Sequence, residues 1–516
     1  MSYHLMDYFV LFLPVVLLIY QLVPQKGRPV VLLLANYVFF YMVSGPLVAY
    51  ILLSTIFTHY IGLWLENVSL TAEVEGKALI MKKRKVLLFG IAISLGILGV
   101  LKYFNFFGQT VADVLALFQV NFVYEPIRFM VPIGISFYTL QMISYITDVY
   151  RGTQKAEHNL LKIALYLSFF PTIMEGPICR YAQVGEELYA GRSITFENLK
   201  FGYQRIVWGL FKKIVIADRL YATVSHVFDN YRDLDGSVIA FGVVCYTVQL
   251  YMEFSGCMDI IIASGEIFGV KLPENFRQPF AAKDASEFWR RWHITLGTFF
   301  KDYIFYSISL AKPVKNLAKK VKEKLGRNVS KFVGPTIALF GVWSCNGLWH
   351  GANWTFIFYG MYYFVLIFIE NITEEPVQKL AQKWNINRES SGYRIFQAVK
   401  MFFIINIGEL FFRANTLQDG FAMLGKIVTD FHISELLGKL SSLKMDVADL
   451  VVVAIGIVVV AIVGSLHERE IKIREEIAKW VLPVRWGMWY AAILAVIMLG
   501  AYGTGYSIVE MIYAGY

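Results

Sequence analysis

Apolar runs long enough to cross a lipid bilayer recur along the whole chain. The first four lie near 8–23, 30–44, 47–65 and 86–107, and the last lies near 485–503. A membrane helix needs about 20 apolar residues, and in hydrocarbon a helix satisfies its own backbone hydrogen bonds. The pattern therefore predicts an all-α integral membrane protein with about eleven or twelve membrane segments, some of them re-entrant.

The composition agrees with this fold class. Of 516 residues, 57% are hydrophobic and 17% are charged, against about 25% charged in soluble domains. No internal repeat or polar domain interrupts the chain, so residues 1–516 are interpreted as a single polytopic transmembrane domain. No positively charged region precedes the first span and no small-residue cleavage site follows it, so we expect it to be retained as an anchor.

The charge pattern indicates orientation in the membrane. The net charge is +9, and basic runs at 82–85 and 312–331 are expected in the cytoplasm, against anionic lipid. A nucleic-acid partner is not expected. The four cysteines show no C-x-x-C spacing, so no metal site is predicted.

One ionisable side chain, His350, lies in the middle of the apolar stretch 332–372. A titratable group at membrane depth is costly, so its presence suggests a function. Gly347 and Gly351 flank it and allow close approach of backbone or substrate. The alternative is a structural histidine bonded to a neighbouring helix. Cys345 lies about 140° from His350 around a regular helix, which disfavours a nucleophile–base pair.

A second histidine, His293, lies in the aromatic and basic segment 273–306. Asp284 followed by Glu287 fits a helix N-cap with a capping box. An apolar stripe then recurs at helical spacing, which predicts one amphipathic helix in the headgroup region. A plain interfacial anchor would show the same pattern. The stripe comprises Phe288, Trp289, Trp292, Leu296 and Phe299.

Polar residues mark several other segments. Those within 131–150 predict a helix that faces an internal cavity or is bonded to its neighbours. The Gly- and Pro-containing stretch 174–180 predicts a re-entrant turn or the end of a span, and 373–394 is expected to be a polar loop. Glu253 and Asp259 lie roughly 240° apart on a helix, so they are not expected to form one site.

The two histidines suggest acyl transfer. A histidine near its ordinary pKa can take a proton from a hydroxyl. Attack on a thioester needs that base, alignment, and dipoles at the developing oxyanion. Side chains near His350 could supply these dipoles, and the candidates are Asn346, Trp349, Asn353 and Trp354. No serine-hydrolase or P-loop motif is present.

Several blocks resemble the signature blocks of the membrane-bound O-acyltransferase (MBOAT) superfamily, most closely its bacterial polysaccharide branch of the alginate O-acetylation type. They run in order over essentially the whole chain, with a core at about 130–415 and additional spans at about 449–503. The four main blocks are EFSGCMD at 253–259, LPENF at 272–276, FWRRWHITL at 288–296 and GLWHGANW at 347–354; lesser ones are MEGPI at 174–178 and LFFRA at 410–414.

The resemblance implies a ring of tilted helices around a funnel, with His350 as the catalytic histidine and His293 as a second histidine lining the funnel. It also implies that an acyl group arrives as a cytoplasmic thioester and leaves towards an extracellular hydroxyl, often through a partner acyltransferase. The ending 510–516 resembles the aromatic tail of this branch only loosely.

We therefore expect an O-acetyltransferase of the bacterial cytoplasmic membrane that acts on an exported polysaccharide. The donor would be acetyl-CoA or an acyl carrier protein, with no tightly bound cofactor. Trp289, Arg290 and Arg291 could bind the donor, because Arg matches phosphate geometry. The alternatives are D-alanyl transfer to teichoic acid, a transporter or flippase, and a non-catalytic scaffold.

Overall fold

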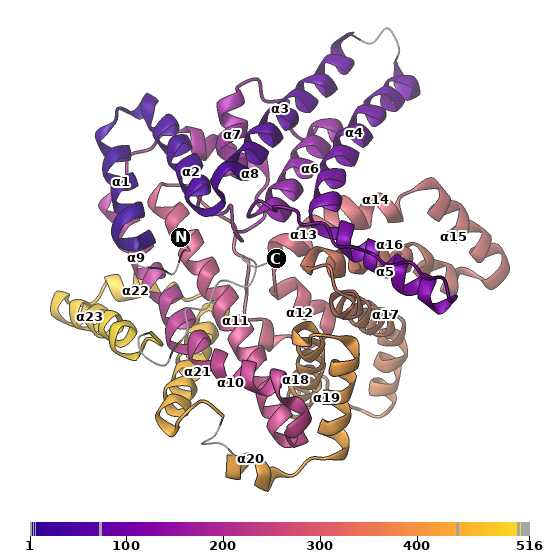
Figure 1. The fold of residues 1–516 in the computed structure, drawn as a ribbon, viewed down its shortest axis with the longest axis vertical. Coiled ribbons are helices and arrows are strands. Elements are labelled where there is room, and N and C mark those ends of the chain that lie inside the picture. The colour runs from indigo at the N-terminus through magenta and orange to yellow at the C-terminus, as the bar shows by residue number, and fades with distance from the viewer. Residues whose placement is uncertain are drawn as a thin grey trace. The chain divides into compact units, whose positions relative to one another are not determined.

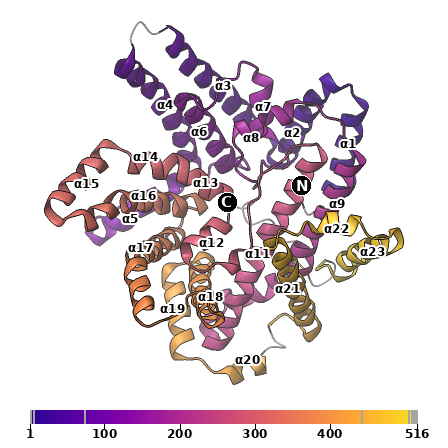
Figure 2. The same cartoon turned by 180° about the vertical axis from the view of Figure 1, so that it is seen from behind.

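The computed structural model describes residues 3, 5, 7–71, 75–439, 443–502 and 506, and these form helices without any strand (Figures 1 and 2). Seven of the described helical stretches are long and apolar enough to cross a membrane. The predicted all-α membrane fold is confirmed. The described chain divides into two compact units, 1–202 with 261–273 and 203–260 with 274–512. Helix α11 (Gly236–Ile267) contributes to both.

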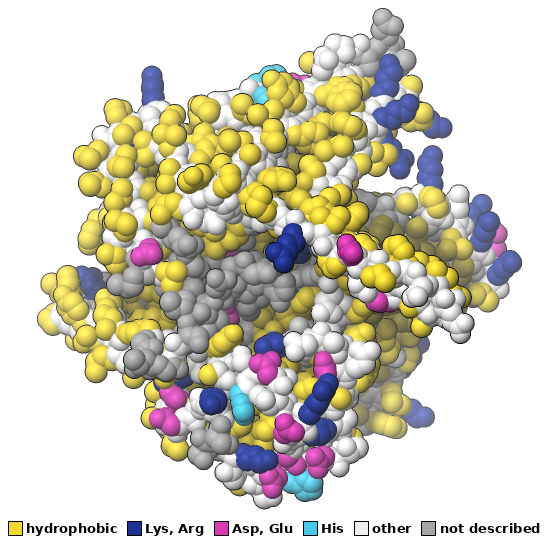
Figure 3. All heavy atoms as spheres, in the orientation of Figure 1, with side chains coloured by type: hydrophobic (Ala, Val, Ile, Leu, Met, Phe, Trp, Pro, Cys, Tyr) yellow, Lys and Arg dark blue, Asp and Glu magenta, His cyan; other side chains and the backbone are white. Residues whose placement is uncertain are grey.

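The first unit contains the expected N-terminal spans. Expected spans 30–44 and 47–65 appear as two helices within one apolar stretch, Gln25–Thr71. Figure 3 shows hydrophobic side chains spread over the outer surface of these helices, as lipid contact requires. The helices of the first unit that are longer than three residues are η1 (Asp7–Phe12), α1 (Leu13–Leu22), α2 (Arg28–Ser44), α3 (Val48–Thr71), α4 (Gly76–Leu98), η4 (Gly99–Tyr103), α5 (Phe104–Leu117), α6 (Ile135–Arg151), α7 (Leu160–Ser168) and α8 (Tyr181–Tyr189). Helix α9 (Phe196–Leu210) begins in the first unit and continues into the second.

Helix α6 is the polar segment predicted to face the interior, and it is buried along almost its whole length. It packs against α3, α4 and α7. The Ser144 hydroxyl donates to the Gln141 carbonyl at 2.8 Å and lies 3.2 Å from the Tyr166 hydroxyl. Residues 174–180 form no helix, and 174–179 are buried, as expected for an irregular segment inside protein.

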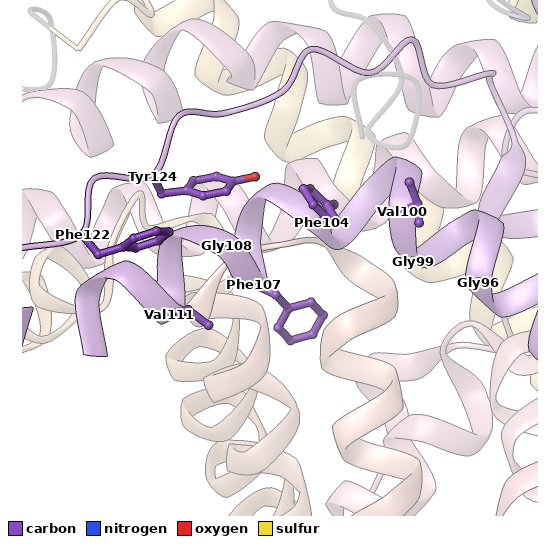
Figure 4. Close-up of a pocket in the computed structure, with 9 residues that line it drawn as sticks. All are labelled: Gly96, Gly99, Val100, Phe104, Phe107, Gly108, Val111, Phe122 and Tyr124. Atoms are coloured by element: carbon purple, nitrogen blue, oxygen red, sulfur yellow. The ribbon is translucent and has the colours of Figure 1, made fainter. Parts of the chain in front are cut away.

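A cavity of about 510 Å³ lies within the first unit, between α4, η4, α5 and the segment that follows (Figure 4). Its walls are glycine and aromatic or aliphatic side chains. Tyr124 alone among them carries a hydroxyl, which donates to Asn105 Oδ1 at 2.8 Å. This cavity holds no acid or base for catalysis.

The second unit contains both candidate catalytic histidines, His293 and His350. The predicted loop at 373–394 is wrong except in its middle, because α17 continues to Lys383 and α18 begins at Ser391. The remaining elements are η5 (Phe211–Ala217), α10 (Asp218–Asp229), α12 (Ala285–Arg291), α13 (Ile294–Phe300), η8 (Lys301–Phe305), α14 (Tyr306–Ser309), α15 (Lys312–Leu325), α16 (Arg327–His350), α17 (Trp354–Lys383), α18 (Ser391–Arg413), α19 (Leu417–Thr429), α20 (Ile433–Lys439), α21 (Val447–Glu468), α22 (Ile473–Ala478) and α23 (Leu482–Leu499).

Helices α16 and α17 form a close pair joined by a short turn. A Cβ on Gly347 would lie 2.6 Å from the Phe356 carbonyl oxygen, and a Cβ on Gly360 would lie 2.4 Å from the Trp343 carbonyl oxygen. The two backbones therefore meet where only glycine fits. This contact sets the position of the last turn of α16, which carries His350.

Glu253 and Asp259 on α11 belong to two separate ion-pair groups, as their spacing predicted. Buried Lys213 lies 3.2 Å from Glu253 and 2.6 Å from Asp218. Lys212 lies 2.6 Å from Asp259, which also accepts from Arg205 at 2.8 Å. Each buried charge is thus paired, as the cost of burying it demands.

Candidate active site

His350 ends α16 and is 3% exposed. Aromatic rings from α17 and α18 surround its imidazole. The ring centroid of Phe412 lies 5.1 Å away and that of Tyr359 lies 6.0 Å away, both nearly perpendicular to the imidazole. The predicted burial of this histidine is confirmed.

His293 lies at a break between two short helices. Helix α12 ends at Arg291, His293 takes a left-handed backbone conformation with φ 46°, and α13 begins at Ile294. The prediction of one continuous amphipathic helix is therefore wrong. The N-cap at its start is confirmed, since Asp284 accepts from the Glu287 N–H at 2.6 Å. The capping box is wrong, because the Glu287 carboxylate accepts from the backbone N–H of Lys283 at 2.9 Å instead.

The indole of Trp349 connects the two histidines. Its ring centroid lies 5.1 Å from that of His350 and 5.4 Å from that of His293. The ring centroid of Phe254 lies 4.9 Å from that of His293. Burial, with a smaller contribution from nearby His350, holds the pKa of His293 well below its ordinary value. His293 is therefore neutral at neutral pH.

Two further polar groups lie beside the histidines and were missed by sequence reasoning. Asn275 is fully buried and accepts hydrogen bonds from the backbone of the two residues that follow His293. Glu409, 1% exposed, accepts from the Tyr359 hydroxyl at 3.1 Å. The available signals were a polar residue within the LPENF block and a carboxylate within an apolar span, which is costly without a function.

The other candidates near His350 divide into two groups. Asn346 is buried one turn before His350, and its Oδ1 accepts no hydrogen bond from the described residues. Trp289 packs edge-on against Tyr363 at 5.0 Å and Tyr359 at 6.1 Å, so it borders the same aromatic cluster. By contrast, Asn353 caps α17, and its amide is already bonded on both sides.

The two arginines predicted to bind the donor are placed differently from each other. Arg290 is exposed. Arg291 lies 2.8 Å from Glu287 and 2.7 Å from Glu468, and it also donates to the Arg277 carbonyl at 3.1 Å. Arg291 is thus held by two carboxylates, whereas Arg290 has the accessibility that phosphate binding needs.

Comparison with known proteins gives the family. The chain is 33% identical over 417 residues to the probable alginate O-acetylase AlgI of Pseudomonas aeruginosa. The matched segment covers 80% of this chain and 72% of that protein. This protein belongs to the membrane-bound O-acyltransferase family. The profile of that family matches residues 154–321. The chain is therefore an acyltransferase, and the transporter and scaffold interpretations are set aside.

Other relatives act on other polymers. The peptidoglycan O-acetyltransferase of Helicobacter pylori is 29% identical over 373 residues, 67% of this chain and 65% of that protein. The teichoic acid D-alanyltransferase of Bacillus subtilis is 29% identical over 296 residues, 55% of this chain and 70% of that protein. The family profile includes His293 and ends before His350. The match assigns no role to a single residue, so the catalytic roles of both histidines stay predictions. The ending 510–516 lies outside the described residues.

Proposed function

We propose that this protein is an O-acetyltransferase of the bacterial cytoplasmic membrane that serves the O-acetylation of an exported polysaccharide. The observation that carries the proposal is the buried pairing of His350 with His293 across Trp349. Relatives named as alginate O-acetylases and a peptidoglycan O-acetyltransferase support the polymer class.

The chemistry follows from one base in a water-poor pocket. His350 takes the proton of an acceptor or relay hydroxyl while the hydroxyl oxygen attacks the thioester carbonyl. The C–S bond then breaks, and the thiolate leaves with that proton. The aromatic rings around His350 exclude water, which would otherwise hydrolyse the thioester. Buried Asn346, one turn away, is the candidate donor to the oxyanion.

The donor is proposed to be a cytoplasmic thioester, acetyl-CoA or an acyl carrier protein, with Arg290 at its phosphates. A partner acyltransferase outside the membrane would receive the acetyl group. The predicted funnel would connect the two sides.

The test is a chemical analysis of the envelope polymer. Cells that carry His350→Ala are expected to lose polymer O-acetylation while the protein stays in the membrane. The matched control is His59→Ala, which removes another buried histidine, on α3. Full acetylation by His350→Ala would refute the proposal, and loss of polymer-bound D-alanine instead would assign the teichoic acid reaction, which the Bacillus subtilis relative makes the second candidate.

A further inference from the structure

Asn275 is the buried group that holds the helix break at His293 together. Its backbone carbonyl accepts from the Ile294 N–H at 3.0 Å. Its side-chain Oδ1 accepts from the Thr295 N–H at 3.0 Å and from the Thr295 hydroxyl at 2.9 Å. These bonds fall on the two residues that follow His293, whose backbone is left-handed. A non-glycine residue persists in that conformation only where its surroundings impose it, and such residues gather at functional sites.

The same oxygen lies beside the imidazole. Asn275 Oδ1 is 3.3 Å from His293 Nδ1. The amide orientation is settled by Thr295, because a backbone N–H can only donate and must face the oxygen of the amide. The amide nitrogen points the other way, and its Nδ2 lies 3.3 Å from Met258 Sδ. An amide oxygen can only accept, so the proton of neutral His293 lies on Nδ1.

We infer that Asn275 is a positioning residue that holds His293 as the Nδ1–H tautomer, so that Nε2 is the atom that accepts a proton during acyl transfer. The inference rests on the proposed function. It narrows the role of His293. A neutral imidazole with its proton on Nδ1 offers a lone pair at Nε2, so His293 receives the proton that His350 has removed from the attacking hydroxyl and passes it on to the leaving thiolate. It does not donate a hydrogen bond from Nε2 to the thioester carbonyl.

The electrostatic surroundings allow a pH test. The titratable group that acts on His293 is His350, on α16. The carboxylates on the neighbouring helix α11, Glu253 and Asp259, are each held by a lysine. A negative charge placed at Asn275, within hydrogen-bond distance of the ring, would stabilise the protonated form of His293 and would raise the pKa of that ring.

The experiment compares Asn275→Asp with Asn275→Leu in acyl transfer from a thioester by the full-length protein in detergent. Asn275→Asp keeps every accepted hydrogen bond and is expected to retain at least about one tenth of kcat, with the acidic limb of its pH profile moved up by about one pH unit. Asn275→Leu removes the tautomer control and is expected to lower kcat about 10²-fold with KM little changed, the size of a lost acid–base contribution. Met258→Leu, which keeps the Oδ1 contacts, is the matched control and should behave as wild type.

A purely structural role for Asn275 predicts otherwise. Asn275→Asp would then fall as far as Asn275→Leu, with no movement of the acidic limb, and that result would overturn the inference. ¹⁵N-histidine NMR, with His293→Gln used to assign the signal, gives a readout besides activity. A proton on Nε2 in the wild type would also overturn it. If His350→Ala keeps full activity, the proposed function fails; if it is inactive while Asn275→Leu acts as wild type, only this inference fails.

Discussion

Replacing Gly360 by alanine tests whether the α16–α17 contact positions His350. The new Cβ would lie 2.4 Å from the Trp343 carbonyl oxygen and 3.3 Å from the Gly347 Cα. Ordinary contact begins at 3.4 Å, so the backbones must separate by about 1 Å at this point. The obstacle is backbone rather than a flexible side chain, and a rotamer change cannot relieve it.

The expected consequence is a loss of rate that exceeds the loss of stability. Displacement of a catalytic group by about 1 Å costs about 10²-fold in rate, which corresponds to about 2.7 kcal/mol of transition-state stabilisation. We expect Gly360→Ala to reduce acyl transfer by about this factor, with KM for the thioester little changed, because the shift acts on the base rather than on the donor site. The assay is turnover of the purified protein in detergent, normalised to the amount of folded protein.

The matched control is Gly425→Ala on α19, where the added Cβ would meet nothing within 4 Å. It introduces the same methyl group into a helix and should leave turnover unchanged. Wild-type turnover by Gly360→Ala would refute the inference that this glycine contact sets the position of His350. A loss of folded protein that accounts for the whole decrease would do the same.

Two other buried groups give predictions. Glu409→Gln keeps an acceptor for the Tyr359 hydroxyl but no longer titrates; we expect turnover to fall 10- to 100-fold with an unchanged melting temperature, and unchanged turnover would make Glu409 structural. Lys213→Met leaves Glu253 and Asp218 without their shared cation. We therefore expect the free energy of unfolding to fall by about 3–5 kcal/mol, measured as a lower melting temperature in detergent. Adding Glu253→Gln should recover part of that loss, and equal melting temperatures for Lys213→Met and wild type would contradict this account.

The sequence predicted what depends on local pattern. Span lengths predicted the helical membrane fold, and the polar residues within 131–150 predicted a helix with protein or a cavity around it, which is buried in the structure. Asp284 was predicted to cap the helix before His293, and its side chain does so. These features arise from residues within one or two turns of each other, where hydrophobic periodicity and capping rules apply.

Other features depend on contacts between distant residues. The stripe from Phe288 to Phe299 has helical spacing, yet the helix breaks at His293 because Asn275 supplies hydrogen bonds to the residues that follow. Local propensity cannot show this, since the competing partner lies eighteen positions earlier. Tyr359 and Glu409 are likewise brought together by the packing of α17 against α18.

The two histidines are held in different ways, and this difference bears on their roles. His350 is placed by helix packing through Gly347 and Gly360, and the described ring contacts around it come from aromatic side chains. His293 is placed by hydrogen bonds to one amide, in a backbone conformation that a helix would not give it. An acceptor at Nδ1 fixes both the position of the His293 ring and the location of its proton. We therefore expect changes at Asn275 to alter the pH dependence of the reaction as well as its rate.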